Sequence, residues 1–352
     1  MKEQAYRAAE CARAARRGAE FVRRFARRPR HFADHGSDFL NYFYGIARTA
    51  ADASLRRWAR AVGLEMARRW RERHPTVPPG ADAEAVYDLL YGSLHCDLFG
   101  LRDPRMKREL RAAARRFSAT DFLGFEPVSE PPPSDVPGCC RCGLWNRRGR
   151  KTCAGCRRRL SCWNRYLVWY VALIRTYMAG RYGVSLGATF ADVLRWLPSL
   201  RPYPSERSDE DFYDAAYAVT HVVYTLNDYD VYSLRPAWLP REFAFLKSHT
   251  AGVVADEDAE TVGEFLSCLK CFGLGGRSPL VRAATDLLLA RQKADGSWGE
   301  TESGDTYADY HTTLVAAAGL MEISWRGEPP GFPSATEGAR RSGGRRVARP
   351  RL

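Results

Sequence analysis

The 352-residue sequence has no apolar run long enough to span a bilayer, which takes about 18 residues or more. The nearest candidate, YLVWYVALIRTYMAG at 166–180, is too short and is interrupted by Arg175. The N-terminus opens on charged residues and has no apolar core segment, so it lacks the pattern of a secretory signal. These absences predict a cytoplasmic protein without a membrane span. Targeting to an organelle by the Arg-rich N-terminus stays open.

Segments in which apolar and polar residues alternate, as they do in half-buried strands, are also missing. Apolar residues instead recur at helical spacing, and Pro and Gly fall where helices must end. The pattern predicts an all-α protein of roughly a dozen helices packed in pairs. In the C-terminal half, helices are expected over 162–182, 189–199, 209–229, 240–249, 256–273, 278–293 and 309–324.

Changes in composition divide the chain into five segments. These are an N-terminal helical region (1–124), a proline-rich linker (125–138), a four-cysteine zinc ribbon (139–160), a C-terminal helical region (161–326) and a basic tail (327–352). The tail has too few large apolar residues to pack, which predicts disorder.

The positive charge is confined to a few segments. The whole chain carries +13, while residues 1–30, 139–159 and 328–352 carry +7, +8 and +4. The remainder therefore carries −6 and is slightly acidic. Net basicity alone does not indicate that the helical body binds nucleic acid.

The strongest local signal is a cluster of cysteines. Cys139, Cys142, Cys153 and Cys156 form two Cys-x2-Cys pairs, a spacing that brings four thiolates to a tetrahedral Zn²⁺. With Asn146 between the pairs, the spacing resembles small zinc ribbons and zinc fingers of the Ran-binding-protein type. A closed four-cysteine site is structural rather than catalytic. The expected cofactor is therefore one structural Zn²⁺.

The same ribbon allows a different interpretation. Arg147, Arg148, Arg150 and Lys151 lie within it, and such side chains bind phosphate groups. Residues 139–159 are thus a candidate nucleic-acid surface, in a protein whose helices would serve as a scaffold.

A second signal lies in YDAAYAVTHVVYTLND, residues 213–228. At 3.6 residues per turn, Asp214, Tyr217, His221, Tyr224 and Asp228 share one face of the expected helix. The opposite face is apolar. Such a polar stripe faces either solvent or a polar cavity.

Two motifs near the C-terminus carry a family resemblance. LLLARQKADGSWGE (287–300) is similar to the QW motif of terpene cyclases, through Gln292, Gly296 and Trp298. DTYADYHTTLVAAAGLMEI (305–323) resembles a helix opening in the β-subunits of protein prenyltransferases, in which the His is a zinc ligand; here it is His311. The family's other ligands form an Asp-x-Cys-Tyr pattern, and in the nearest segment, 214–217, an Ala stands in place of the thiolate.

The resemblance is to the prenyltransferase and squalene-cyclase superfamily, and it covers the C-terminal half. It implies an α/α toroid-like barrel of helix pairs, with the four-cysteine ribbon inserted, and a hydrophobic, isoprenoid-like substrate in a central cavity. In that arrangement the helices at 209–229 and 309–324 would both face the cavity. His221, Asp214, Asp309 and His311 are then candidate ligands of a second divalent metal, Zn²⁺ or Fe²⁺.

The remaining polar side chains of these two helices are candidate catalytic groups. Tyr217, Tyr224 and Tyr310 could orient the substrate, transfer protons or stabilise a carbocation. Asp228 is the expected carboxylate partner of His221, because the seven-residue spacing places both on one stripe. The sequence therefore predicts a metal-dependent enzyme. The alternatives are a nucleic-acid- or partner-binding protein and a purely structural barrel.

Overall fold

The structure is a computed structural model that describes residues 7–139, 143–146 and 149–329. Over these ranges the chain forms thirteen α-helices, one 3-10 helix and a single two-stranded hairpin, so the predicted all-α class is confirmed. Six helices precede the hairpin: α1 (Ala8–Arg27), α2 (Pro29–Thr49), α3 (Ala53–Arg73), α4 (Ala83–Leu98), α5 (Pro104–Ala114) and α6 (Ala119–Leu123). None of the described helices has both the length and the apolar content that a membrane crossing requires.

The hairpin consists of β1 (Val136–Gly138) and β2 (Ser161–Trp163), which pair in antiparallel register around the ribbon segment. The later elements are α7 (Arg165–Tyr182), α8 (Phe190–Leu194), η1 (Leu197–Leu200), α9 (Phe212–Leu226), α10 (Pro240–Ala255), α11 (Ala259–Cys271), α12 (Pro279–Arg291) and α13 (Ala308–Leu320). Residues 330–352 of the predicted tail lie outside the described residues.

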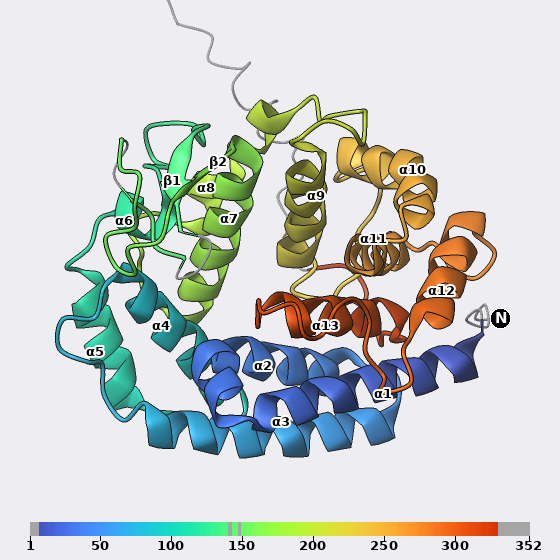
Figure 1. Cartoon of the computed structure of the whole chain (residues 1–352), viewed down its shortest axis with the longest axis horizontal. Helices are drawn as coiled ribbons and strands as arrows, with labels where there is room; N and C mark the ends of the chain where they lie inside the picture. Colours follow the sequence, from blue (N-terminus) through green and yellow to red (C-terminus); the bar gives the residue numbers. More distant parts are fainter. Residues whose placement is uncertain (1–6, 140–142, 147–148, 330–352) are drawn as a thin grey trace, which may run out of the picture.

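Many helices begin at a polar side chain that satisfies the free backbone amides of the first turn. Asp52, Asp82, Asp103, Asn164 and Asp258 each accept hydrogen bonds from the amides two or three residues further on. The cap at Asp52 starts α3 only three residues after α2 ends. The two long helices therefore form an antiparallel pair, as Figure 1 shows along its lower edge.

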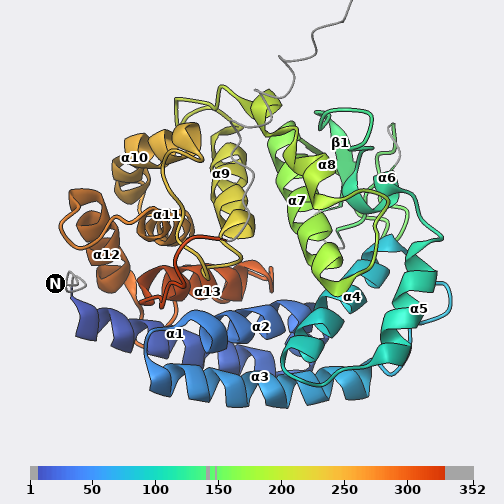
Figure 2. The same ribbon diagram turned by 180° about the vertical axis from the view of Figure 1, so that it is seen from behind.

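Six of the described helices surround one cavity. Helices α2, α4, α7, α9, α11 and α13 all contribute residues to it, and each contacts the next in this order. Helix α13 also lies along α1 and close to α2, which Figures 1 and 2 show from opposite sides. Contacts between successive helices of this set thus extend from α2 to α13, and α13 in turn contacts the N-terminal helix α1. Assignment to the toroid superfamily stays a prediction.

The QW-like turn after α12 joins the last helices to the first. The Gln292 side-chain amide donates to the backbone oxygens of Ala14 on α1 and of Gly296, at 2.8 and 3.0 Å. Gly296 has φ +93°, which the turn requires and which glycine adopts readily. Trp298 is fully buried and its indole N–H donates to the Leu288 carbonyl at 2.7 Å. The motif therefore connects the end of α12 to α1.

The proline-rich linker is held against the protein. The Pro127 carbonyl accepts hydrogen bonds from Arg195 and from the Trp196 indole, at 2.5 and 2.9 Å. Residues 136–138 then enter the hairpin. The segment expected as an extended spacer is therefore anchored at both ends.

Helices α11 and α13 cross at a pair of glycines. A Cβ atom at Gly319 would lie 2.5 Å from the Gly263 carbonyl oxygen, and one at Gly263 would lie 2.9 Å from the Val315 carbonyl oxygen. Both neighbouring atoms belong to rigid helical backbone. The close approach of these helices therefore depends on the missing side chains.

Replacing Gly319 with Ala should lower the free energy of unfolding by about 1–3 kcal/mol, because the added methyl group forces the two helices apart. Gly180→Ala is the matched control, since Gly180 lies in α7 and a Cβ there meets no atom within 4 Å. The control should be neutral or stabilising by up to about 1 kcal/mol. Denaturant titration of both variants tests the crossing, and equal stabilities would contradict it.

Candidate active site

The central cavity has a volume of about 620 Å³. Its wall is rich in phenol and carboxyl groups. The tyrosines that line it are Tyr42, Tyr87, Tyr91, Tyr170, Tyr217, Tyr224, Tyr229 and Tyr307. The acidic residues that line it are Asp34, Asp38, Glu84, Asp88, Asp230, Glu260 and Glu264. His221, His311 and Arg175 complete the set of titratable groups, and the slight acidity predicted for the helical body is thus concentrated here.

Three of the surrounding helices carry a pair of acidic residues four positions apart. The pairs are Asp34 and Asp38 on α2, Glu84 and Asp88 on α4, and Glu260 and Glu264 on α11. Residues four apart share one face of a helix. This spacing was a signal in the sequence for the cavity-facing surface, and the motif analysis did not use it.

Glu260 and His311 form an ion pair between the first turns of α11 and α13. Their nearest atoms, Oε1 and Nδ1, are 3.0 Å apart. The carboxylate also accepts hydrogen bonds from the hydroxyls of Thr312 and Tyr217, at 2.9 and 3.0 Å. Burial opposes the charged form of Glu260, but the charge of His311 and these hydrogen bonds lower its pKa to about 2.

The pKa of the His311 imidazole shifts in the opposite direction to that of Glu260. Burial alone would lower the pKa of His311, yet the adjacent Glu260 carboxylate raises it above the usual value. His311 therefore favours the protonated state, and the pair holds one positive and one negative charge in the cavity wall.

Glu264, one turn along α11, has the opposite electrostatic environment. It is almost fully buried, and its partners are neutral: the Thr220 hydroxyl donates to its carboxylate, and Tyr224 donates to its backbone carbonyl at 3.3 Å. Burial and then the nearby Glu260 charge raise the pKa of Glu264 to about 8. Two carboxyl groups on one helix face are thus in different protonation states at neutral pH, the arrangement that distinguishes a proton donor from a charged partner.

The cavity contains a second carboxyl group of this kind across from α11. Burial raises the pKa of Asp88 to about 7, although a hydrogen bond from Ser37, at 2.5 Å, acts against the increase. The charge of Asp38 adds to it. Protons are therefore available on both sides of the cavity near neutral pH.

Three residues of the predicted stripe on α9 reach the cavity. Tyr217, His221 and Tyr224 all line it. Burial lowers the pKa of His221 to about 4, so the imidazole is neutral at pH 7. Its Nδ1 lies 2.8 Å from the Tyr217 carbonyl oxygen and must donate to it, since a carbonyl only accepts. The other ring nitrogen, Nε2, is left as an acceptor.

The predicted partnership of Asp228 with His221 is wrong. Helix α9 ends at Leu226, and Asp228 has φ +57°, so it leaves the helical stripe. Its carboxylate binds Arg48 and Arg181 and accepts a hydrogen bond from the Tyr177 hydroxyl. Burial would raise its pKa, but these partners lower it. Asp228 anchors the turn after α9 and is not among the residues that line the cavity.

Three other predicted residues also lie outside the lining. Asp214 accepts a hydrogen bond from Asn164 at 2.7 Å, at the start of α9. Asp309 accepts hydrogen bonds from the backbone and hydroxyl of Ser303, at 2.8 and 2.7 Å. Tyr310 is fully buried behind the wall, and its hydroxyl donates to Asp38 at 2.7 Å. The expected ligand set of two histidines with Asp214 and Asp309 is therefore not assembled in the cavity.

The ribbon does contain a group suited to a metal. Ligating atoms of Cys139, Cys153 and Cys156 all lie within 4.8 Å of one another. Across the described ranges this is the one group of three or more Cys, His, Asp or Glu ligands that meets that spacing. The fourth predicted ligand, Cys142, lies outside the described residues. Three convergent thiols fit a zinc-like metal ion.

Side chains around the thiols fix the ribbon in place. The Asn146 amide accepts a hydrogen bond from the Ala154 backbone at 2.9 Å and lies 3.9 Å from the Cys153 sulfur. Trp145 is buried, packs edge-on against Trp163, and donates to the Phe122 carbonyl at 3.0 Å. These contacts support a structural role. The alternative of nucleic-acid binding by residues 139–159 stays a prediction, and Arg147 and Arg148 lie outside the described residues.

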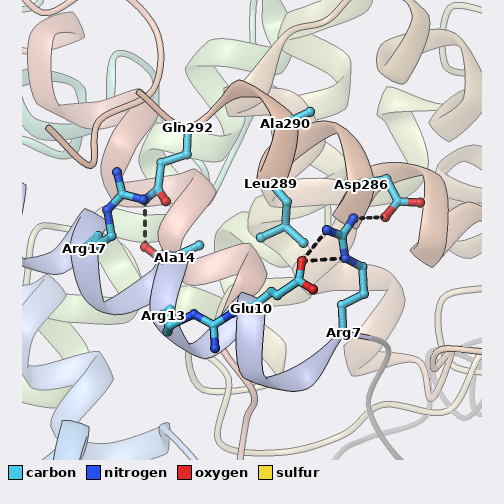
Figure 3. A pocket seen from close by; sticks show the side chains of 9 residues that line it. All are labelled: Arg7, Glu10, Arg13, Ala14, Arg17, Asp286, Leu289, Ala290 and Gln292. Atoms are coloured by element: carbon cyan, nitrogen blue, oxygen red, sulfur yellow. Dashed lines mark hydrogen bonds and ion pairs between the residues drawn. The ribbon is translucent and has the colours of Figure 1, made fainter. Parts of the chain in front are cut away.

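A smaller pocket lies on the surface between α1 and α12 (Figure 3). Two of its arginines already have partners within the protein. Arg7 pairs there with Glu10 and with Asp286. Arg17 donates to the backbone carbonyls of Lys293 and Ala294, at 2.8 and 3.0 Å. These arginines connect the first helix to the last pair of helices.

We expect the purified chain to contain about one equivalent of zinc, held by the ribbon. Cys153→Ser should remove it, since it replaces a converging thiol, whereas Cys162→Ser should keep it, because Cys162 lies on β2 outside the group. Elemental analysis after dialysis measures the difference. Retention of full zinc by the Cys153 variant would refute the assignment.

The raised pKa of Glu264 also predicts how stability depends on pH. The unfolded chain loses this proton near pH 4.5 and the folded chain near pH 8, so the folded form binds more protons between these values. The stability that Glu264 contributes by holding this proton is fully present below pH 4.5. It decreases as the pH rises and is lost once the pH passes about 8.

The wild type should therefore lose stability relative to Glu264→Gln between about pH 5 and pH 8, by up to about 1.4 kcal/mol per pH unit. The Gln side chain stays uncharged over this range, and other titrating groups cancel in the comparison. Denaturant unfolding of both proteins at several pH values gives the difference, and a constant difference would show that Glu264 has an ordinary pKa.

Comparison with known families adds one finding. Residues 173–321 match the model of a domain of unknown function, DUF6895. The matched segment runs from within α7 to the end of α13, so it includes Glu260, Glu264 and His311 but excludes α2 and α4. A search among curated proteins gives no match to the chain. The chain is therefore similar to this domain over the segment that carries the ion pair.

Proposed function

We propose that the protein is an enzyme that transfers a proton to a hydrophobic small molecule bound in the central cavity. The observation that carries the proposal is the pair of carboxyl groups on α11. One of them, Glu260, is held ionised by His311, and the other, Glu264, keeps its proton at neutral pH. Glu264 is the proposed general acid.

The neighbouring groups suit this division of roles. Glu260 supplies a negative charge one helical turn from the proton donor, and this charge raises the pKa of Glu264 further, whereas the charge of His311 acts against the increase. After proton transfer the Glu264 carboxylate carries a negative charge, which favours the positive charge left on the substrate. His221, neutral with Nε2 as an acceptor, is the proposed acceptor of a proton returned by the product.

The apolar part of the wall indicates the substrate class. Val171, Ile174, Leu314, Val315 and Met321 line the cavity between the tyrosines. Aromatic faces stabilise positive charge, and hydrocarbon side chains accommodate an apolar skeleton. An isoprenoid-like molecule fits this lining, in keeping with the resemblance of one C-terminal motif to terpene cyclases and of the other to prenyltransferase β-subunits.

The proposal needs no metal in the cavity. The expected second metal lacks a ligand set there, because Asp214 and Asp309 bind Asn164 and Ser303 instead. The proposed metal of the protein is the Zn²⁺ of the ribbon. Its role would be to hold the segment between β1 and β2 against α6.

The test is turnover in deuterated water with a panel of isoprenoid and other apolar molecules. Because the carboxyl proton of Glu264 exchanges with solvent, the product should gain deuterium, which mass spectrometry detects. Glu264→Gln should lower the rate by about 10²–10⁴-fold. Glu65→Gln, an exposed change on α3, is the control and should leave the rate unchanged.

Turnover that survives in Glu264→Gln would refute its role as the acid. Product without solvent deuterium would refute proton transfer as the reaction.

A further inference from the structure

Both cationic groups in the described cavity wall are paired with a carboxylate. Glu84 binds Arg175 with the nearest atoms 2.6 Å apart, and Glu260 binds His311 at 3.0 Å. Within the described part of the chain, Arg175 and His311 are the only cationic residues that line the cavity. An anionic headgroup entering the cavity therefore meets no cation that is not already held by a carboxylate.

Asp38 on α2 is different. Its Oδ2 accepts a hydrogen bond from the Tyr310 hydroxyl at 2.7 Å, and no Lys, Arg or His among the described residues forms an ion pair with it. His35, one turn earlier, lies beside Tyr310, and its Nε2 is 2.8 Å from the Thr306 hydroxyl. Burial lowers the pKa of His35, so this imidazole does not neutralise the carboxylate at pH 7.

Aromatic side chains surround this carboxylate. After burial, the charge of Asp38 is the largest cause of the raised pKa of Tyr91, Tyr307 and Tyr310, which come from helices α4 and α13 and the segment before it. Tyr91 also stacks on Tyr87, with ring centroids 6.0 Å apart. Tyr91 and Tyr307 line the same cavity as Asp38. A carboxylate near several phenol rings suits an alkylammonium group, because aromatic faces attract cations.

One further side chain lacks a partner. Tyr42, one turn after Asp38 on α2, lines the cavity and is 6% exposed. Its hydroxyl oxygen is buried and has no hydrogen-bond partner among the described residues. A buried polar group without a partner carries a free-energy cost that a bound ligand can remove. Among the described residues on the α2 side of the cavity, Asp38 thus lacks a cationic partner and the Tyr42 hydroxyl lacks a hydrogen-bond partner.

We propose that Asp38 and the surrounding tyrosines bind an ammonium group, so that the ligand of the cavity is an apolar molecule that carries a positive charge. The use of this ligand as a substrate rests on the proposed function; its binding does not. The uncompensated carboxylate supplies the attraction, and the rings replace the water that a cation loses on entering.

The test compares three probes that share a hexyl chain and differ in the headgroup: hexyltrimethylammonium, 1-hexanol and hexyl sulfate. Isothermal titration calorimetry on the full chain gives each affinity. The ammonium probe should bind at least about tenfold more tightly than the alcohol, and the sulfate should bind least. Equal binding of the three probes, or no binding of the ammonium probe, would overturn the proposal.

Variants locate the binding position. Asp38→Asn should reduce the affinity for the ammonium probe to that for the alcohol, whereas Glu65→Gln makes the same change in net charge on the outer face of α3 and should have no effect. Tyr91→Leu keeps the carboxylate and removes a ring, so it should weaken ammonium binding even if the Asp38 variant fails to fold. Unchanged ammonium binding in both cavity variants would overturn the assignment.

Glu264→Gln separates this inference from the proposed function. It removes the proposed acid and leaves the ammonium position intact, so binding of the probe should persist while turnover is lost. Loss of turnover without selective ammonium binding would leave Glu264 as the acid and refute the ammonium position.

Discussion

Helix α13 contacts α11 on one side and α1 on the other, and this double contact joins the last helices of the chain to the first. The glycines of the α11 crossing allow it, and the turn that contains Gln292 and Trp298 secures it. The site depends on the same contact, because His311 on α13 meets Glu260 on α11, and Tyr310 reaches Asp38 on α2. Packing that closes the fold therefore also assembles the cavity wall.

The chemistry of the cavity depends on whether each carboxyl group has a cationic or a neutral partner. Glu260 has a cationic partner, which lowers its pKa, whereas Glu264 and Asp88 lack one and keep their protons at higher pH. Among the described residues, the phenol of Tyr310 is the hydrogen-bond partner of Asp38. A single buried surface thus combines fixed charges, proton donors and an uncompensated carboxylate, a combination more typical of a catalytic site than of a packing interface.

Local patterns predicted the helices and the QW-like turn because both depend on short-range spacing and on a few turn and cap residues. The spacing of Tyr217, His221 and Tyr224 predicted a shared polar face and left solvent and cavity open, and these three side chains line the cavity. The spacing failed for Asp228, because α9 ends two residues earlier and the chain turns toward Arg48 and Arg181. The Glu260–His311 pair joins separate helices and depends on tertiary packing, which periodicity within one helix does not report.

The most direct measurement of this account is the infrared difference spectrum between the wild type and Glu264→Gln at neutral pH. A protonated carboxyl group has a carbonyl stretching band distinct from the bands of a carboxylate. The account predicts that the wild type shows this band, that the variant lacks it, and that the band disappears as the pH is raised through about 8. Loss of a carboxylate band instead would show that Glu264 is ionised at neutral pH and would contradict its assignment as the acid.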